Sequence, residues 1–196
     1  MSTISTTKMT AQQFLELGED PVGVRLELVN GEVAVSPSAT PNHSYTEKIL
    51  TTIMVNHVRS KKLGRLYGDV DTMFGRYNVR RPDLIFFFNS RLNLVGETAM
   101  KGPPDLCVEI VSPSSRLIDR RDKFKQYAKG KVAHYWIIDP EDRTAEAFEL
   151  ARGAYRPAGS GKNDEVVKFP PFLDLKIPLG EIWEPERPKP SIKRNS

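Results

Sequence analysis

The stretch PPDLCVEIVSPSSRLIDRRDKFKQYAKGKVAHYWIID, residues 103–139, decides the fold. Two apolar runs, DLCVEIVS at 105–112 and AHYWIID at 133–139, flank a segment with helical character from about 117 to 129. Continuous apolar runs are typical of central strands that helices cover on both faces. The order strand, helix, strand therefore predicts an α/β sheet with these two runs near its centre.

The rest of the chain extends this sheet. DLIFFF at 83–88 reads as a third central strand, and shorter strands are expected at 64–70, 71–78, 144–150, 154–158 and 165–169. VRLELVNGEVAVS at 24–36 predicts a β-hairpin about Asn30-Gly31, because that pair is the strongest short turn signal. Apolar residues at helical spacing predict a helix from Pro41 to about Lys62. The expected fold class is a mixed α/β sheet with helices on both faces and an N-terminal hairpin.

Composition and length indicate one globular domain. The chain has 196 residues, of which 39% are hydrophobic and 28% charged. We expect a single domain over 10–183, with disordered segments at 1–9 and 184–196. Near Thr10, the spacing to Gln13 predicts a capped short helix. GSGKNDE at 159–165 is expected to be a hairpin loop, since it lacks the spacing of a phosphate-binding loop.

Charge and cysteine content suggest a compartment but no partner. The net charge of +4 is compatible with a polyanionic partner, and many proteins without one share it. The single cysteine, Cys107, lies in an apolar run, which favours a reducing compartment and a cytoplasmic location. No apolar run approaches 18 residues, and the first residues do not resemble a secretory signal, so no membrane association is expected.

Glu109 is the residue that needs an explanation, because it stands in the middle of a central strand. A buried carboxylate without a partner costs several kcal/mol or takes up a proton. Asp83 begins the neighbouring apolar run, and Lys123 lies on the helix that follows Glu109. Two carboxylates on adjacent strands can hold Mg²⁺, and a nearby ammonium can position water or stabilise charge on a phosphate. This set predicts a metal-dependent site.

The helix supports the position of Lys123. Asp119, Lys123 and Tyr127 are spaced at i, i+4 and i+8, which places them in one row. This row borders an apolar face expected to be formed by Leu117, Phe124 and Ala128. Lys123 is therefore expected to lean from the edge of the buried surface toward the sheet. Arg120 lies within the arc expected to face the sheet, which makes it a second candidate cation.

Each of these residues also has an ordinary structural explanation. Asp83 follows a proline, and a Pro-Asp pair is common at strand entries and turns. For Glu109 the alternative is a structural ion pair with Lys123 or Arg120, although such buried pairs stabilise less than apolar replacements. Alone, Lys123 is typical of a solvated helix surface and Tyr127 of core packing.

Three stretches of the sequence resemble the Uma2 family of endonucleases: LELVNGEVAVSPSATPNHS at 26–44, RRPDLIFF at 80–87, and residues 103–140. The last is the most specific, because a Glu-x-x-Ser-Pro-Ser start, an Asp-x-x-x-Lys-x-x-x-Tyr helix and a Tyr-Trp-x-x-Asp-Pro strand follow in order. The resemblance covers roughly residues 10 to 180. The family is assigned to the PD-(D/E)XK nuclease fold, so the resemblance implies a restriction-endonuclease-like core.

The resemblance also implies roles for individual residues. Asp83 and Glu109 would be metal ligands for Mg²⁺, with Mn²⁺ as an alternative, and Lys123 would be the catalytic cation. The wider fold places a lysine two residues after the second acid, where this chain has Val111, and the family pattern is similar in carrying it on the helix. Glu27 matches an acid of the first hairpin that would complete the site.

Two histidines bear on the resemblance. His43 matches a recurring histidine at the start of the first long helix, although alone it is more typical of a surface or capping residue. His134 departs from the family, because it replaces an acid before the late strand. That change bears on the local loop and on a partner of Arg120 or Arg121, and it leaves the three core residues in place.

The first functional hypothesis is therefore a Mg²⁺-dependent endonuclease that hydrolyses phosphodiester bonds in DNA. Basic residues are expected to flank the site and meet backbone phosphates: Arg80, Arg81, Arg116, Arg120 and Arg121. The alternative is a catalytically inactive nucleic-acid-binding or interaction module on a nuclease scaffold. A glycosidase with two carboxylates ranks lower, because basic residues rather than aromatic ones flank the acids. Many nucleases that cut both strands are dimers, so a homodimer is the suggested assembly.

Overall fold

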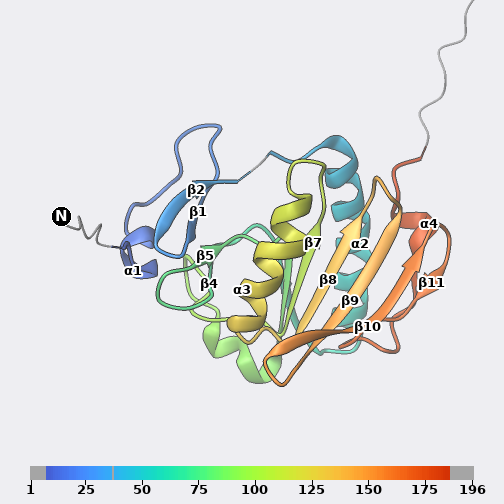
Figure 1. Cartoon of the computed structure of the whole chain (residues 1–196). Helices are drawn as coiled ribbons and strands as arrows, with labels where there is room; N and C mark the ends of the chain where they lie inside the picture. The colour runs from blue at the N-terminus through green and yellow to red at the C-terminus, as the bar shows by residue number, and fades with distance from the viewer. Residues whose placement is uncertain (1–7, 37, 186–196) are drawn as a thin grey trace, which may run out of the picture.

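The computed structural model describes residues 8–36 and 38–185. Its centre is a six-stranded sheet with the strand order β10-β9-β8-β7-β6-β3. Figure 1 labels four of these strands, β7 to β10. The strands are β3 (Gly64–Tyr67), β6 (Leu84–Phe88), β7 (Leu106–Ile110), β8 (His134–Asp139), β9 (Thr144–Ala151) and β10 (Ala154–Lys162). Strands β7 and β8 pair parallel, and every other neighbouring pair is antiparallel. The predicted mixed sheet is confirmed.

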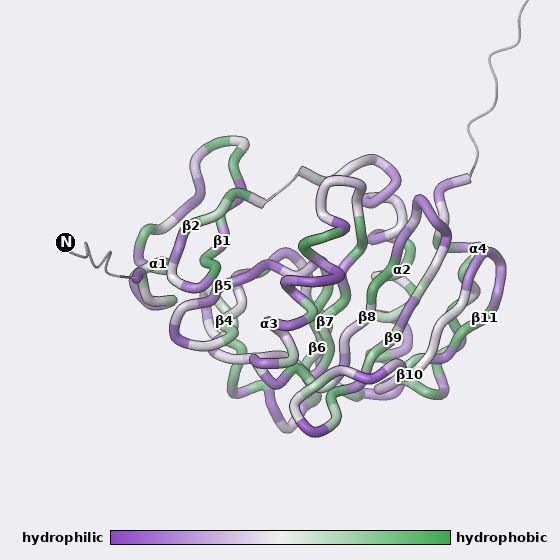
Figure 2. Tube along the Cα trace, in the orientation of Figure 1, coloured by the Kyte–Doolittle hydropathy of each residue, from purple (hydrophilic) through white to green (hydrophobic). Residues whose placement is uncertain are grey.

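Helices cover both faces of this sheet. Helix α2 (Pro41–Ser60) packs on one face, while the π-helical segment η2 (Ile118–Lys123) and helix α3 (Phe124–Lys129) pack on the other (Figure 1). Side chains of a strand alternate between faces, so Val108 joins the core under α2 and Cys107 joins the core under α3. Figure 2 shows the apolar character of the chain where β6 and β7 cross the molecule. By this alternation Glu109 shares the α3 side with Cys107.

Helix α2 begins and packs as its sequence predicts. The Thr40 hydroxyl accepts a hydrogen bond from the backbone N–H of His43 at 3.2 Å, and Pro41 occupies the first helical position. The row Leu50, Met54 and Val58 is buried, with at most 2% of each side chain exposed. This cap fixes the first turn, and His43 with it, beside the sheet.

The N-terminal hairpin belongs to a second, four-stranded sheet with the order β2-β1-β5-β4. Its strands are β1 (Leu26–Val29), β2 (Glu32–Val35), β4 (Thr72–Met73) and β5 (Val79–Arg80). Asn30 and Gly31 both have positive φ, 53° and 87°, as a tight hairpin turn requires. The predicted hairpin is therefore confirmed. The short helix α1 (Ala11–Leu15) has the predicted capping box between Thr10 and Gln13.

The remaining elements close the domain. They are the 3₁₀ helix η1 (Asn89–Leu94), the two-stranded sheet of β11 (Val166–Val167) and β12 (Ile177–Pro178), and helix α4 (Leu179–Ile182). The expectation of a loop over 159–165 is wrong for 159–162, because β10 continues to Lys162 after a register shift between Pro157 and Gly159, while 163–165 form the turn before β11. The expected place of Leu117 on the apolar helix face is also wrong, since 79% of that residue is exposed.

Most of both segments expected to be disordered, 1–9 and 184–196, lies outside the described residues, which leave out 1–7 and 186–196. Met9 belongs to the fold, because its backbone N–H donates to the carbonyl of Gly31 at 3.1 Å. In the part of the chain that the structure describes, no helix combines the length and apolar character needed to cross a membrane.

Candidate active site

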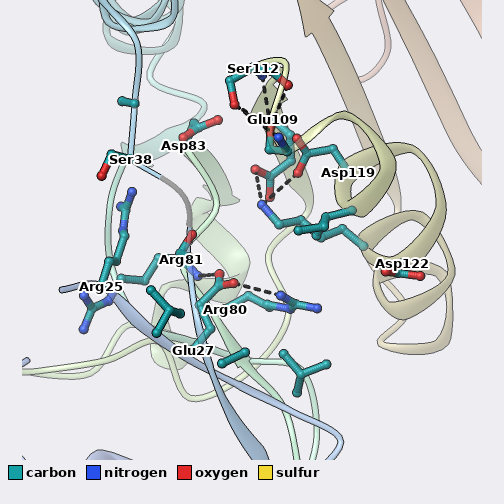
Figure 3. A pocket seen from close by; sticks show the side chains of 18 of the residues that line it. Arg25, Glu27, Ser38, Arg80, Arg81, Asp83, Glu109, Ser112, Asp119 and Asp122 are labelled. Carbon is teal, nitrogen blue, oxygen red and sulfur yellow. Dashed lines mark hydrogen bonds and ion pairs between the residues drawn. The ribbon is translucent and has the colours of Figure 1, made fainter.

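Glu109 has two hydrogen-bond partners, Lys123 and Tyr127. Lys123 Nζ donates to Glu109 Oε2 at 2.7 Å, and the Tyr127 hydroxyl donates to Oε1 at 2.5 Å. Lys123 Nζ also lies 2.9 Å from Asp119 Oδ1. Only 2% of Glu109 is exposed, and each of its oxygens accepts one of these hydrogen bonds inside the protein. Figure 3 shows Glu109 beside Asp119 at the wall of the pocket. The carboxylate in the middle of the central strand is thus partnered by a buried ammonium and a phenol.

A π-turn carries the lysine. Residues Ile118–Lys123 form a π-helical turn, and its two buried residues are Asp119 and Lys123. Such turns replace the usual i→i+4 hydrogen bonds and occur frequently at functional sites. The row of Asp119, Lys123 and Tyr127 expected from the helical spacing is therefore brought together at β7. The sequence singled out Asp119 and Tyr127 through this spacing, but it assigned neither of them to Glu109.

Asp83 stands beside Glu109 at the entry to β6. Its Oδ2 accepts a hydrogen bond from the backbone N–H of Ile110 at 2.6 Å and lies 3.2 Å from His43 Nε2. Burial opposes ionisation of Asp83, but the hydrogen bond from His43 and the positive charge of Lys123 outweigh it and lower its pKa. Asp83 is consequently a carboxylate held ionised beside the buried pair. His43, which alone resembled a capping residue, is brought into the site.

Glu27 enters the site from the hairpin. Glu27 Oε2 accepts from Arg80 Nη1 at 2.8 Å, and Oε1 accepts from the backbone N–H of Arg81 at 3.1 Å. Arg80 also donates through Nε to Gln126 of α3 at 2.7 Å. Arg80 is only 4% exposed, so the expectation that it meets backbone phosphates from the flank of the site is wrong. It binds an acid of the hairpin to the helix that follows Glu109.

We expect Arg80→Met to lower the free energy of unfolding by about 2–3 kcal/mol, because the buried Glu27 would keep only one hydrogen bond from the backbone. Adding Glu27→Gln should recover part of that loss, since the second change removes the uncompensated charge. Urea unfolding of the two single variants and the double variant measures this coupling. Additive losses would show that Glu27 and Arg80 do not stabilise one another.

These side chains line one cavity of about 490 Å³ between the hairpin and η2 (Figure 3). Glu27, Asp83, Glu109 and Lys123, the residues expected to form the site, all line it, and so does His43. They come from β1, the start of β6, β7, η2 and α2. The fold therefore brings together residues that are up to 96 positions apart in the sequence.

The buried cluster is short of positive charge. It holds four carboxylates and two permanently charged cations: Glu27, Asp83, Glu109 and Asp119 against Arg80 and Lys123. All six side chains line the cavity. If every carboxylate ionises, two negative charges remain, which is the charge that one divalent cation neutralises. A protonated His43 or a proton on Glu109 offsets part of the same deficit.

The shortage of positive charge in the buried cluster is consistent with a raised pKa of Glu109. Burial raises this pKa to about 8, against the opposing attraction of Lys123 and with a further rise from Asp119 and Asp83. The pKa of Lys123 is raised as well, since the surrounding carboxylates outweigh the effect of its burial. The ammonium thus stays charged, and Glu109 is the member of the pair that takes up the proton.

This shift makes stability depend on pH. The folded state binds the Glu109 proton more tightly than the unfolded state, so its contribution to stability is complete below the ordinary pKa of 4.5 and is lost as the pH rises toward 8. We expect metal-free wild type to lose stability relative to Glu109→Gln by about 1.4 kcal/mol per pH unit at most within that window. Urea unfolding in EDTA across the window measures this difference. A difference that is constant with pH would contradict the raised pKa.

The donor set fits Mg²⁺. Among the described residues, no three His, Cys, Asp or Glu side chains form a group able to hold a metal ion by themselves. Mg²⁺ does not need one, since it commonly binds one or two carboxylates and keeps waters and phosphate oxygens in its other positions. The hydrogen bonds of Asp83 with the described residues use Oδ2, which leaves Oδ1 as a donor atom. Asp83 and Glu109 are the carboxylates that could hold the ion.

The arginines expected to meet phosphates are mostly engaged in ion pairs. Arg81 pairs with Asp71, at 2.6 Å, and with Asp20. Arg116 Nη1 lies 2.7 Å from Asp142 and Nη2 lies 3.0 Å from the buried Asp139.

Arg120 pairs with Glu146 on β9, so the prediction that it is a second cation facing Glu109 is wrong. Arg121 is exposed and has no ion pair within 8–36 and 38–185. His134 lies opposite Glu149 in the β8–β9 register, and its backbone N–H donates to the carbonyl of Asp105 at 3.0 Å. The change at this position therefore does not alter a partner of Arg120.

The mixed sheet with helices on both faces, together with a cavity that Asp83, Glu109 and Lys123 line, defines a nuclease-like α/β protein. The model of the Uma2 family, described as "Putative restriction endonuclease", matches residues 11–180, and the chain belongs to this family. The fold is similar to the crystal structure of a putative nuclease of the DUF820 family from Anabaena variabilis ATCC 29413. The TM-score is 0.73 and the identity 20%, over 89% of this chain and 97% of the other. No curated protein matches.

Proposed function

We propose that this protein is a divalent-metal-dependent endonuclease that hydrolyses phosphodiester bonds in DNA. The observation that carries the proposal is the buried Glu109–Lys123 pair at 2.7 Å, with Asp83, directly before the neighbouring strand β6, lining the same cavity. The family's description supports a nuclease, and the charge deficit of the cluster supports a divalent cation. A structural ion pair alone would not need a cavity beside it.

The residues have distinct tasks in this proposal. Asp83 and Glu109 would hold Mg²⁺ or Mn²⁺, which would supply Lewis-acid stabilisation of the phosphate and a more acidic water. Lys123 lies between Glu109 and Asp119, so its ammonium is positioned to orient the attacking water or to stabilise the charge that develops on the phosphate. His43 fixes the orientation of Asp83 through Oδ2.

Glu27 has an auxiliary task. Its carboxylate is fixed by Arg80 and by the backbone of Arg81 at the hairpin wall of the cavity. There it adds negative charge that favours a cation near Asp83 and Glu109. We therefore assign it to the electrostatics of the site rather than to direct contact with the reacting atoms.

A non-catalytic nucleic-acid-binding module is the second candidate. The observation that favours it is that Lys123 is held by two carboxylates at 2.7 and 2.9 Å, as in a structural ion pair. Such a module would bind DNA equally well with and without divalent metal and would leave every phosphodiester bond intact.

Cleavage of supercoiled plasmid in Mg²⁺, Mn²⁺ or EDTA tests the proposal. We expect nicking by wild type in either metal, no nicking in EDTA, and loss of nicking in Lys123→Ala. Lys125→Ala is the matched control, because Lys125 is exposed two residues further along the same helical segment. A folded wild type that leaves the plasmid and its denatured strands uncut in both metals, or that cuts equally well in EDTA, would contradict the proposal.

A further inference from the structure

The reacting groups of the site lie at the bottom of the cavity. Glu109 is 2% exposed and Lys123 7%, whereas Val33 and Val35 on the hairpin strand β2 are 45% and 68% exposed. These two valines line the cavity, and Ile118 of η2 lines it as well. Aliphatic side chains therefore form part of the wall beside the path of a phosphate to Lys123.

The cavity lining is acidic overall. Six acidic residues and four permanent cations line it: Glu27, Glu32, Asp83, Glu109, Asp119 and Asp122 against Arg25, Arg80, Arg81 and Lys123. Glu32 and Asp122 are exposed, and Arg25 is paired with Asp69. The lining therefore offers no row of free cations to a nucleic-acid backbone.

Of the arginines expected beside the site, only the exposed Arg121 has no ion pair within 8–36 and 38–185, so they do not supply that row either. Residues 186–196, which lie outside the described residues, contain four basic residues and one acidic residue, so most of the net charge of +4 belongs to them. Arg81, Arg116 and Arg120 are held in ion pairs with acids of this chain. Within 8–36 and 38–185, positive and negative charges are therefore nearly balanced.

A DNA duplex makes demands that this surface does not meet. It carries about one charge per 1.7 Å of helix axis, and proteins that hold it typically neutralise about six to ten phosphates. The cavity instead has the volume of a small-ligand pocket, about 490 Å³ within the usual range of roughly 300–1,000 Å³. A pocket of this size accommodates an unpaired nucleotide, whose phosphate can reach Lys123 at the buried end of the cavity.

We propose that the substrate of this site is an unpaired DNA strand, of which one nucleotide enters the cavity. Val33 and Val35 would contact its sugar or base, while its phosphate would reach Lys123 and the metal carboxylates. This inference rests on the proposed nuclease function and adds the strandedness of the substrate. The few phosphates contacted also make binding weakly dependent on salt.

The test compares one labelled DNA strand alone with the same strand in a perfect duplex, in Mg²⁺. We expect the single strand to be cut at least about tenfold faster, since the duplex must first open at the cut. Its affinity should vary with salt with a log–log slope of about −1 to −2, compared with about −5 or steeper for six duplex contacts. A duplex cut as fast as the single strand, or a steep slope for the single strand, would overturn the inference.

A second arm tests the wall of the cavity directly. Val33→Trp fills space at the exposed side of the cavity and should slow cleavage of the single strand at least about tenfold. Val166→Trp, on β11 outside the cavity lining and 59% exposed, is the matched control and should leave cleavage unchanged. If a folded Val33→Trp variant cleaved the single strand at the wild-type rate, the inference would also be overturned. If wild type cleaved neither the single strand nor the duplex, the proposed nuclease function itself would be overturned. If it cleaved the duplex faster, only the inference of an unpaired substrate would be overturned.

Discussion

Glu109→Gln is expected to lower kcat/KM for metal-dependent cleavage by about 10³-fold or more, without loss of the fold. Glutamine has the volume of glutamate and can still accept a hydrogen bond from Lys123 and contact the Tyr127 hydroxyl, which lie 2.7 and 2.5 Å from the carboxylate. The amide cannot contribute the negative charge that holds a divalent cation. Plasmid nicking rates in saturating Mg²⁺, with circular dichroism as a check on folding, measure the effect.

The matched control for this change is Glu149→Gln. Glu149 lies on β9 of the same sheet and is exposed, so its replacement should leave the nicking rate unchanged. If Glu109→Gln cut DNA at the wild-type rate, Glu109 would be a structural partner of Lys123 only, and the metal site would have to lie elsewhere.

Lys123→Met is expected to lower the free energy of unfolding by about 3–5 kcal/mol near pH 9, because it leaves Glu109 and Asp119 buried without their shared cation. Methionine keeps most of the aliphatic volume, so the loss reports charge rather than a cavity. Without the ammonium the pKa of Glu109 should rise further above 8, and a proton on Glu109 relieves the repulsion at lower pH. The destabilisation should therefore shrink toward about pH 5.

Urea unfolding of Lys123→Met and wild type at both ends of this pH range measures the effect. Lys125→Met is the control, because Lys125 is exposed. This variant should unfold like wild type at both pH values. A loss of equal size at high and low pH would mean that Lys123 contributes packing and not charge compensation. A variant too unstable to purify at pH 9 but folded at low pH would agree with the expectation.

Much of the fold follows from short-range patterns in the sequence. The Asn30-Gly31 pair specifies the hairpin because both residues adopt positive φ, which few other pairs tolerate. The continuous apolar runs identify β6, β7 and β8 because these strands are buried on both faces. The helical spacing of Asp119 and Lys123 was sufficient to place the lysine near the sheet, where it contacts Glu109.

The sequence analysis failed where side-chain direction depends on local or long-range geometry. The π-turn at Ile118–Lys123 breaks the ordinary helical angle, so an extrapolation with regular spacing wrongly placed Leu117 on the apolar face and Arg120 opposite Glu109. The Glu27–Arg80 pair joins positions 53 residues apart through the two-residue strand β5, which has no recognisable pattern of its own. Pairing across sheets of this kind is set by tertiary packing.

Calorimetric titration of Mn²⁺ and Mg²⁺ into the metal-free protein tests the central claim most directly, because that claim is a divalent cation held by Asp83 and Glu109. We expect one ion bound per chain in wild type, and binding weakened at least about 100-fold in Asp83→Asn and in Glu109→Gln. Glu149→Gln should bind like wild type. An absence of binding by the folded wild type at millimolar metal, or binding that survives both substitutions unchanged, would contradict the account.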